Sequence, residues 1–225
     1  MQKEIFIGNK KVSLFFDSSK PVPFIYFNGV FDSSEKLWNM CKQIGCGEFA
    51  LVAISGLNWD DDMTPWYCPA LSKKDTPCGG KADEYLTLLT DKIMPAVAEL
   101  SEVKPLYNAI TGYSLAGLFA LYSLYKTDKF SKAACASGSF WYPDFNTYAM
   151  QNKFIKTPDC IYFSLGDKES KTANARLRTV QTNTETLEAF YKNKGIKTTF
   201  VLNKGNHFQN TDLRMANGIK WILEE

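Results

Sequence analysis

Residue types that support nucleophilic catalysis occur in this chain in the order serine, carboxylate, histidine. Ser114 lies within Gly-Tyr-Ser-Leu-Ala-Gly, the carboxylates Asp167 and Glu169 follow in Gly-Asp-Lys-Glu, and His207 lies in Lys-Gly-Asn-His-Phe. In such a triad an imidazole takes the proton of the serine hydroxyl, and a carboxylate orients the imidazole. The residue types and their order therefore indicate acyl transfer through a serine, with either carboxylate as the orienting acid.

The surroundings of Ser114 are typical of a nucleophile elbow. Gly112 and Ala116 stand two positions to either side, and such small residues let a strand turn sharply into a helix and expose the hydroxyl. Ala116 replaces the glycine of the strict motif, but a methyl group is still small. The backbone N–H of Leu115, at the start of the following helix, is then expected to contribute to an oxyanion hole.

His207 is the one histidine among 225 residues. This count excludes zinc or iron sites that need two or three imidazoles, and we expect neither a metal nor an organic cofactor. The 26 basic and 24 acidic residues give a formal charge of +2, which argues against nucleic acid or an anionic membrane as an obligatory partner. The six cysteines show no C-x-x-C spacing, so a zinc ribbon or a thioredoxin-type motif is not indicated.

Short apolar blocks alternate with helical patterns along the chain, which predicts an α/β protein with a mostly parallel sheet and helices on both faces. Alternating apolar residues among the first 16 predict an antiparallel edge hairpin. In such a sheet, sites form at the carboxyl ends of strands, where the serine, the carboxylates and the histidine all fall. The expected strands are 24–27, 49–54, 106–111, 132–136, 161–165 and 198–202, and the expected helices are 33–43, 83–100 with an interruption at Pro95, 115–125, 174–194 and 211–223.

No linker or repeat divides the sequence, so we expect a single domain over 1–225. Segment 105–125 has no charged residue, but its polar first half favours a strand, a turn and a buried helix over a membrane span. The N-terminus carries Glu4 where a signal peptide would be apolar, which predicts a cytoplasmic protein with reduced thiols. If the protein is instead exported, Cys68 and Cys78 are the pair expected to bridge.

Three segments resemble a known family. They are 79–95, beginning Gly-Gly-Lys-Ala-Asp-Glu, 112–122, beginning Gly-Tyr-Ser-Leu-Ala-Gly, and 137–142, Ser-Gly-Ser-Phe-Trp-Tyr. The likeness runs from about residue 21 to the C-terminus, and the chain resembles the esterase branch of the α/β-hydrolases that includes esterase D, feruloyl esterases and enterochelin (siderophore) esterases. The resemblance implies the α/β-hydrolase fold with little or no separate lid.

The same resemblance bears on two site residues. In related enzymes the acid commonly falls three residues after the glycine at the strand end, which places Glu169 ahead of Asp167. The family likeness also places the oxyanion loop at 28–31, so Val30 is the expected second donor beside Leu115.

Substrate contacts are expected from aromatic residues near the strand ends, many of them in segment 58–67. The alternative interpretation is that half of these aromatics belong to the core. The acidic residues 60–62 lack the ligand spacing of a calcium loop and are interpreted as a solvated turn. The expected substrate-binding residues are Phe31, Trp66, Trp141 and Phe208.

Together these features predict a serine hydrolase that cleaves a small-molecule carboxylic ester. Ser114 attacks, His207 acts as general base and then acid, Glu169 orients it, and water hydrolyses the acyl-enzyme. Two alternatives remain open. The same residues can transfer the acyl group to an alcohol or thiol, or the fold can serve a non-catalytic binding protein. The sequence does not indicate an oligomeric state.

Overall fold

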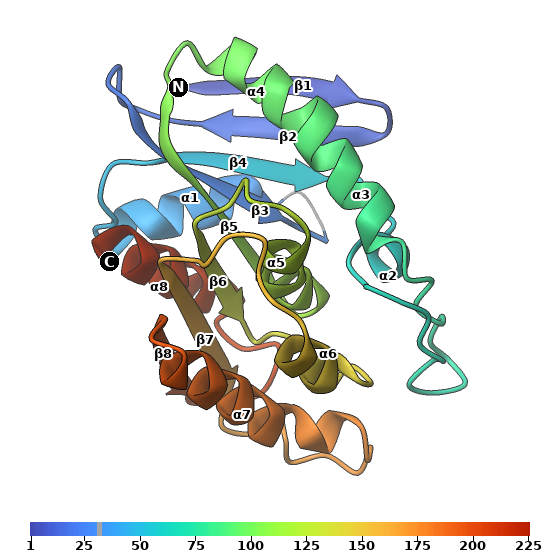
Figure 1. The fold of residues 1–225 in the computed structure, drawn as a ribbon. Helices are drawn as coiled ribbons and strands as arrows, with labels where there is room; N and C mark the ends of the chain where they lie inside the picture. Colours follow the sequence, from blue (N-terminus) through green and yellow to red (C-terminus); the bar gives the residue numbers. More distant parts are fainter. Residues whose placement is uncertain (31–32) are drawn as a thin grey trace.

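The computed structural model describes residues 1–30 and 33–225, and a central sheet organises them (Figure 1). Its eight strands lie in the order β1-β2-β4-β3-β5-β6-β7-β8. β2 pairs antiparallel with β1 and β4, whereas all pairs from β4 through β3, β5, β6 and β7 to β8 are parallel. The strands are β1 (Gln2–Ile7), β2 (Lys10–Phe15), β3 (Val22–Asn28), β4 (Ala50–Ser55), β5 (Pro105–Tyr113), β6 (Lys132–Ala136), β7 (Cys160–Gly166) and β8 (Lys197–Asn203).

Helices cover both faces of this sheet (Figure 1). α1 and α8 pack against each other on one face, and α8 also contacts β5, β6 and β7. α5 packs on β5 and β6 on the other face, with α3 beside it, and α6 and α7 lie toward β7 and β8. The helices are α1 (Ser34–Gln43), α2 (Trp59–Asp62), α3 (Ala82–Leu88), α4 (Met94–Ser101), α5 (Leu115–Lys126), α6 (Phe145–Gln151), α7 (Val180–Asn193) and α8 (Thr211–Glu224).

The pattern of apolar residues in each strand matches the burial of that strand. Every residue of β3, β6 and β7 is buried, because helices cover both faces of these parallel strands, and such strands read as continuous apolar runs. In contrast, β1 at the edge alternates exposed and half-buried residues. The prediction of a mostly parallel sheet with helices on both faces and an antiparallel N-terminal edge is therefore confirmed.

The uncharged segment 105–125 forms β5 and most of α5 at the centre of the molecule. Leu115 through Tyr125 are all buried, so this helix needs no polar face. The interpretation as strand, turn and buried helix is thus confirmed. In the part of the chain that the structure describes, no helix combines the length and the apolar character needed to cross a bilayer.

Two helices depart from the predicted boundaries. The expected interruption at Pro95 takes the form of a π-helical turn, Leu89–Ile93, directly before α4, where Pro95 occupies the first turn and its missing N–H costs little. α7 begins later than expected, after a 3₁₀ turn at Leu177–Thr179. The Asn174 side chain accepts hydrogen bonds from the amides of Arg176 (2.9 Å) and Leu177 (3.2 Å), which holds this stretch as a turn.

α8 offers a direct test of this layering, because its buried face fixes it to the sheet. Ile219 is 0% exposed, whereas Leu213 on the same helix is 36% exposed. We expect Ile219→Ala to lower the free energy of unfolding by about 2–5 kcal/mol, because a cavity remains among rigid neighbours. Leu213→Ala should cost well under half as much. Urea unfolding of both variants measures the difference, and equal losses would contradict this packing.

Candidate active site

The residues singled out for chemistry meet at the carboxyl end of the parallel strands. Ser114 follows β5 directly, Glu169 lies three residues after the end of β7, and His207 lies four residues after the end of β8. β5, β6, β7 and β8 are neighbours in the sheet and run in parallel, so their carboxyl ends share one edge. This shared edge is where the sheet topology of a doubly wound fold places its sites.

Ser114 occupies a strained turn between β5 and α5. Its backbone has φ 61° and ψ −123°, a conformation that residues with a side chain rarely adopt. A Cβ on Gly112 would lie 2.3 Å from the carbonyl carbon and oxygen of Ala116, so the turn requires a glycine there. The turn is held by the Ser114 amide, which donates to the Ala136 carbonyl (3.2 Å), and by the Ser139 amide, which donates to the Ser114 carbonyl (3.0 Å).

His207 lies between Ser114 and Glu169. Its Nε2 is 3.1 Å from Ser114 Oγ, and its Nδ1 is 2.7 Å from Glu169 Oε2. The backbone of His207 is anchored as well, because the Tyr113 hydroxyl donates to its carbonyl (2.7 Å). The three side chains thus form one continuous line of hydrogen bonds.

Asp167, the alternative acid, has a different partner. Its Oδ1 accepts a hydrogen bond from the Gly205 amide (2.8 Å), and its own amide donates to the Asn203 carbonyl (2.7 Å). Asp167 therefore ties the segment after β7 to the segment that carries His207, and Glu169 is the carboxylate that contacts the imidazole.

The carboxylate of Glu169 is almost enclosed, with only 4% of the side chain exposed. Oε1 accepts hydrogen bonds from the Gly166 amide (2.6 Å), the Ser137 hydroxyl (2.8 Å) and Arg214 Nη1 (3.1 Å). Burial by itself raises the pKa of Glu169, but the His207 contact and the Gly166 and Ser137 hydrogen bonds outweigh it and lower that pKa. The carboxyl group is therefore held in its charged form.

Arg214 on α8 was not foreseen from the sequence. It is 1% exposed, and besides Glu169 its guanidinium donates to the Tyr113 hydroxyl (3.1 Å), the Ser137 hydroxyl (3.3 Å) and the Lys204 carbonyl (3.3 Å). The sequence did contain a signal. Arg214, Gly218 and Ile222 recur at a spacing of four, and all three are buried in α8. A charge in register with a buried helix face needs a buried partner.

The two expected oxyanion donors come from different segments, the start of α5 and the loop after β3. Leu115 is the first residue of α5, and the first amides of a helix have no carbonyl partner within it. The Gly29 amide is engaged, because it donates to the Ile54 carbonyl (2.9 Å). The next amide along the loop after β3 is that of Val30. Val30 and Ser114 line one cavity of about 390 Å³.

Three cavities reach Ser114, and several aromatic side chains line them. Trp141 and Phe208, both expected at the substrate, line two cavities each. Trp59 also lines two of them, although the sequence analysis did not select it from segment 58–67. Phe31, also expected at the substrate, lies outside the described residues.

Trp66 corrects the expectation placed on it. It does not line the cavities that reach Ser114, and its indole N–H donates to the Pro143 carbonyl (3.1 Å). Its ring packs in an aromatic cluster because the chain after α2 turns this side chain inward. The cluster partners are Tyr122, Tyr142, Phe145 and Tyr148.

The acidic residues 60–62 also differ from the solvated turn that was expected. Asp62 pairs with the buried Lys10 (2.5 Å), and Asp61 pairs with Lys81 (2.8 Å). These ion pairs fix α2 against β2 and the start of α3. Within residues 1–30 and 33–225, no group of three or more His, Cys, Asp or Glu side chains converges as metal ligands would.

Solved structures share this fold at low sequence identity. The siderophore hydrolase EstA from Aspergillus nidulans superposes with a TM-score of 0.78 at 18% identity, covering 100% of this chain and 94% of that one. An IroE-like serine hydrolase from Shewanella oneidensis gives a TM-score of 0.77 at 13% identity, covering 100% and 80%. Among curated sequences, the uncharacterized protein YbbA of Bacillus subtilis (strain 168) is 25% identical over 196 residues, which are 84% of this chain and 78% of YbbA.

The α/β-hydrolase fold of these neighbours agrees with the sheet order and helix layers described above. The resemblance drawn from segments 79–95, 112–122 and 137–142 is confirmed, because the model of the family named Putative esterase matches residues 11–210. With nearly the whole described sheet inside that match, the chain belongs to this esterase family and is a carboxylic ester hydrolase.

Proposed function

We propose that the protein hydrolyses its ester through an acyl-enzyme formed on Ser114. The observation that carries this proposal is the hydrogen-bonded line from Ser114 Oγ to His207 Nε2 (3.1 Å) and from His207 Nδ1 to Glu169 Oε2 (2.7 Å). In this arrangement a base touches the nucleophile and a carboxylate fixes the base, which is the geometry of a Ser-His-acid triad.

In the first half-reaction, His207 Nε2 takes the proton of Ser114 as Oγ bonds to the ester carbonyl carbon. The carbonyl oxygen becomes an oxyanion, which the amides of Leu115 and Val30 receive. The bond from carbon to the alcohol oxygen then breaks, and His207 Nε2 gives its proton to that oxygen. The products are a free alcohol and an acyl group on Ser114.

In the second half-reaction, water replaces the alcohol. His207 Nε2 takes a proton from the water as its oxygen attacks the acyl carbonyl, and then returns the proton to Ser114 Oγ as the acyl bond breaks. Glu169 acts in both halves by holding Nδ1–H and by stabilising the imidazolium. Its charge is available because its pKa is lowered in the folded protein.

The first test of this proposal is covalent labelling of the nucleophile. A fluorophosphonate should form one adduct on Ser114, and Ser114→Ala should abolish both labelling and ester hydrolysis. His207→Ala should be comparably damaging, because there is no other histidine to replace it. Ser139→Ala is the matched control, because it removes a neighbouring hydroxyl, 3.3 Å from Ser114 Oγ, and leaves the nucleophile in place, so this variant should still take the label. Peptide mass mapping locates the adduct, and labelling that persists in Ser114→Ala would refute the assignment.

A second test separates the two carboxylates. Glu169→Gln should lower kcat by about 10²–10⁴-fold, because an amide neither stabilises the imidazolium nor selects the required tautomer. Asp167→Asn should have little effect, since the asparagine oxygen can still accept from the Gly205 amide. Steady-state kinetics on one activated ester compare the variants, and the reverse ranking would move the role to Asp167.

A third test uses the pH dependence of stability. The pKa of Glu169 is lower when folded than in the unfolded chain, so its contribution is present above the unfolded pKa of about 4.3 and is lost as pH falls toward the folded pKa. We expect Glu169→Gln to cost about 3–5 kcal/mol near pH 7, because the variant leaves Arg214 without its carboxylate. Urea unfolding at several pH values should show that the difference in the free energy of unfolding between the unmodified protein and Glu169→Gln narrows below pH ~4. A gap independent of pH would contradict a charged Glu169.

A further inference from the structure

Ser114 lies at the junction of three cavities, of about 420, 390 and 300 Å³. Each pair of cavities shares one aromatic side chain. Trp59 lines the two larger ones, Trp141 lines the largest and the smallest, and Phe208 lines the two smaller ones. An ester has two arms on either side of its carbonyl carbon, so the arms must be distributed among these cavities.

His207 distinguishes the cavities. It lines those of 390 and 300 Å³ but is absent from the lining of the cavity of 420 Å³, which Leu115 and the loop 68–78 border instead. We call this largest cavity the loop cleft. It lies between Ser114 and the loop 68–78, and its lining includes Trp59, Ala70, Leu71, Leu115 and Trp141.

We propose that the loop cleft receives the acyl arm of the ester and that the alcohol arm leaves through the cavities that His207 lines. This assignment rests on the proposed function. When the bond from carbon to alcohol oxygen breaks, the proton on His207 Nε2 must reach that oxygen, so the alcohol arm has to lie on the imidazole side of Ser114. The acyl arm keeps its bond to the carbonyl carbon and needs no contact with His207.

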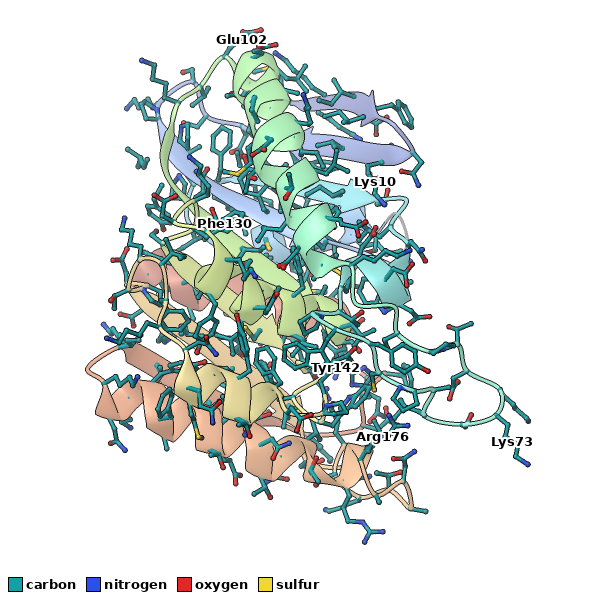
Figure 2. All side chains as sticks on the ribbon, turned by 45° about the vertical axis from the view of Figure 1, so that its right-hand side comes forward. Lys10, Lys73, Glu102, Phe130, Tyr142 and Arg176 are labelled. Carbon is teal, nitrogen blue, oxygen red and sulfur yellow. The ribbon has the colours of Figure 1, made fainter. Side chains whose placement is uncertain are left out.

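Hydrogen bonds to backbone atoms hold the wall of the loop cleft in place. Cys68 and Cys78 pair at its base through backbone hydrogen bonds of 3.0 and 2.9 Å. Arg176 Nη1 and Nη2 then donate to the carbonyls of Pro69 (2.8 Å) and Ala70 (2.5 Å). Figure 2 shows Arg176 toward the body of the molecule, while Lys73 marks the outer end of the projecting loop.

The lining indicates which acyl groups the loop cleft accepts. The indoles of Trp59 and Trp141 and the apolar side chains of Ala70 and Leu71 offer contact to hydrocarbon or ring carbons. The residues from 72 to 77 are exposed and place charged groups at the outer part of the loop. An acyl arm that extends several carbons beyond the carbonyl therefore gains contacts that an acetyl group cannot make.

The experiment fills each cavity and varies one arm of the ester at a time. Ala70→Trp places a large ring in the loop cleft, which the half-buried Ala70 lines. For p-nitrophenyl esters from acetate to octanoate, we expect the kcat/KM ratio of octanoate to acetate to fall at least about tenfold in this variant. For acetates of alcohols of increasing length, the corresponding ratio of long to short alcohol should stay as in the unmodified enzyme.

Two matched variants fill the other cavities. Thr211→Trp narrows the cavity of 390 Å³ and Leu177→Trp the cavity of 300 Å³. At least one of them should lower the ratio of long to short alcohol by about tenfold, and neither should change the ratio of octanoate to acetate. Thermal unfolding of all variants checks that each retains a cooperative transition.

The outcomes separate the two proposals. Suppose that the unmodified enzyme cleaves both series of esters. If Ala70→Trp then changes the kcat/KM ratio of long to short alcohol, or leaves the ratio of octanoate to acetate unchanged, the assignment of the loop cleft is overturned and the proposed function stands. Loss of the acyl preference in Thr211→Trp or Leu177→Trp also overturns it. If the unmodified enzyme cleaves neither series and takes no label on Ser114, the proposed function fails and the assignment falls with it.

Discussion

The burial of one carboxylate, that of Glu169, constrains how the strand ends are arranged. A charge taken out of water is costly unless opposite charges and hydrogen-bond donors replace the solvent. Glu169 obtains them from the end of β7, from Ser137 after β6, from Arg214 on α8 and from His207 after β8. Because these donors belong to separate elements, the carboxylate fixes their positions relative to one another, and the line to Ser114 depends on that arrangement.

Arg214 extends the same constraint across the sheet. Its guanidinium reaches the Tyr113 hydroxyl, which in turn holds the backbone of His207, so one buried cation connects the ends of β5, β7 and β8. The close packing leaves no room for a side chain at Gly166, whose Cβ would lie 2.9 Å from Arg214 Nη2 and 2.3 Å from the Gly205 carbonyl oxygen. A residue on the helical layer thereby stabilises a site built on loops, with α8 held in turn by its apolar face.

The fold could be predicted from the sequence because the pattern of apolar residues that marks a strand or a helix lies within a short stretch of chain. Continuous apolar blocks form the strands, and the elbow around Ser114 and the lone His207 required no knowledge of tertiary contacts. Glu169 and Asp167 are two residues apart in one turn, and only the path of that turn decides which faces the imidazole; family likeness, not spacing, favoured Glu169. Trp66 and Trp59 show the same limit, because both pack against the core and only the tertiary structure decides that Trp59, and not Trp66, also lines a cavity at Ser114. The role of Arg214 could not be predicted in this way, because its partner Glu169 lies 45 residues away along the chain.

The anchoring of the loop 68–78 has a consequence for how such an enzyme diversifies. Arg176 binds carbonyl oxygens of the loop, and the two ends of the loop are joined by backbone hydrogen bonds. Every residue supplies a carbonyl, so these contacts do not depend on which side chains the loop carries. Substitutions there can accumulate in evolution while the loop keeps its position. Under the proposed assignment of the loop cleft, each such substitution changes which acyl groups the enzyme accepts without disturbing the catalytic residues.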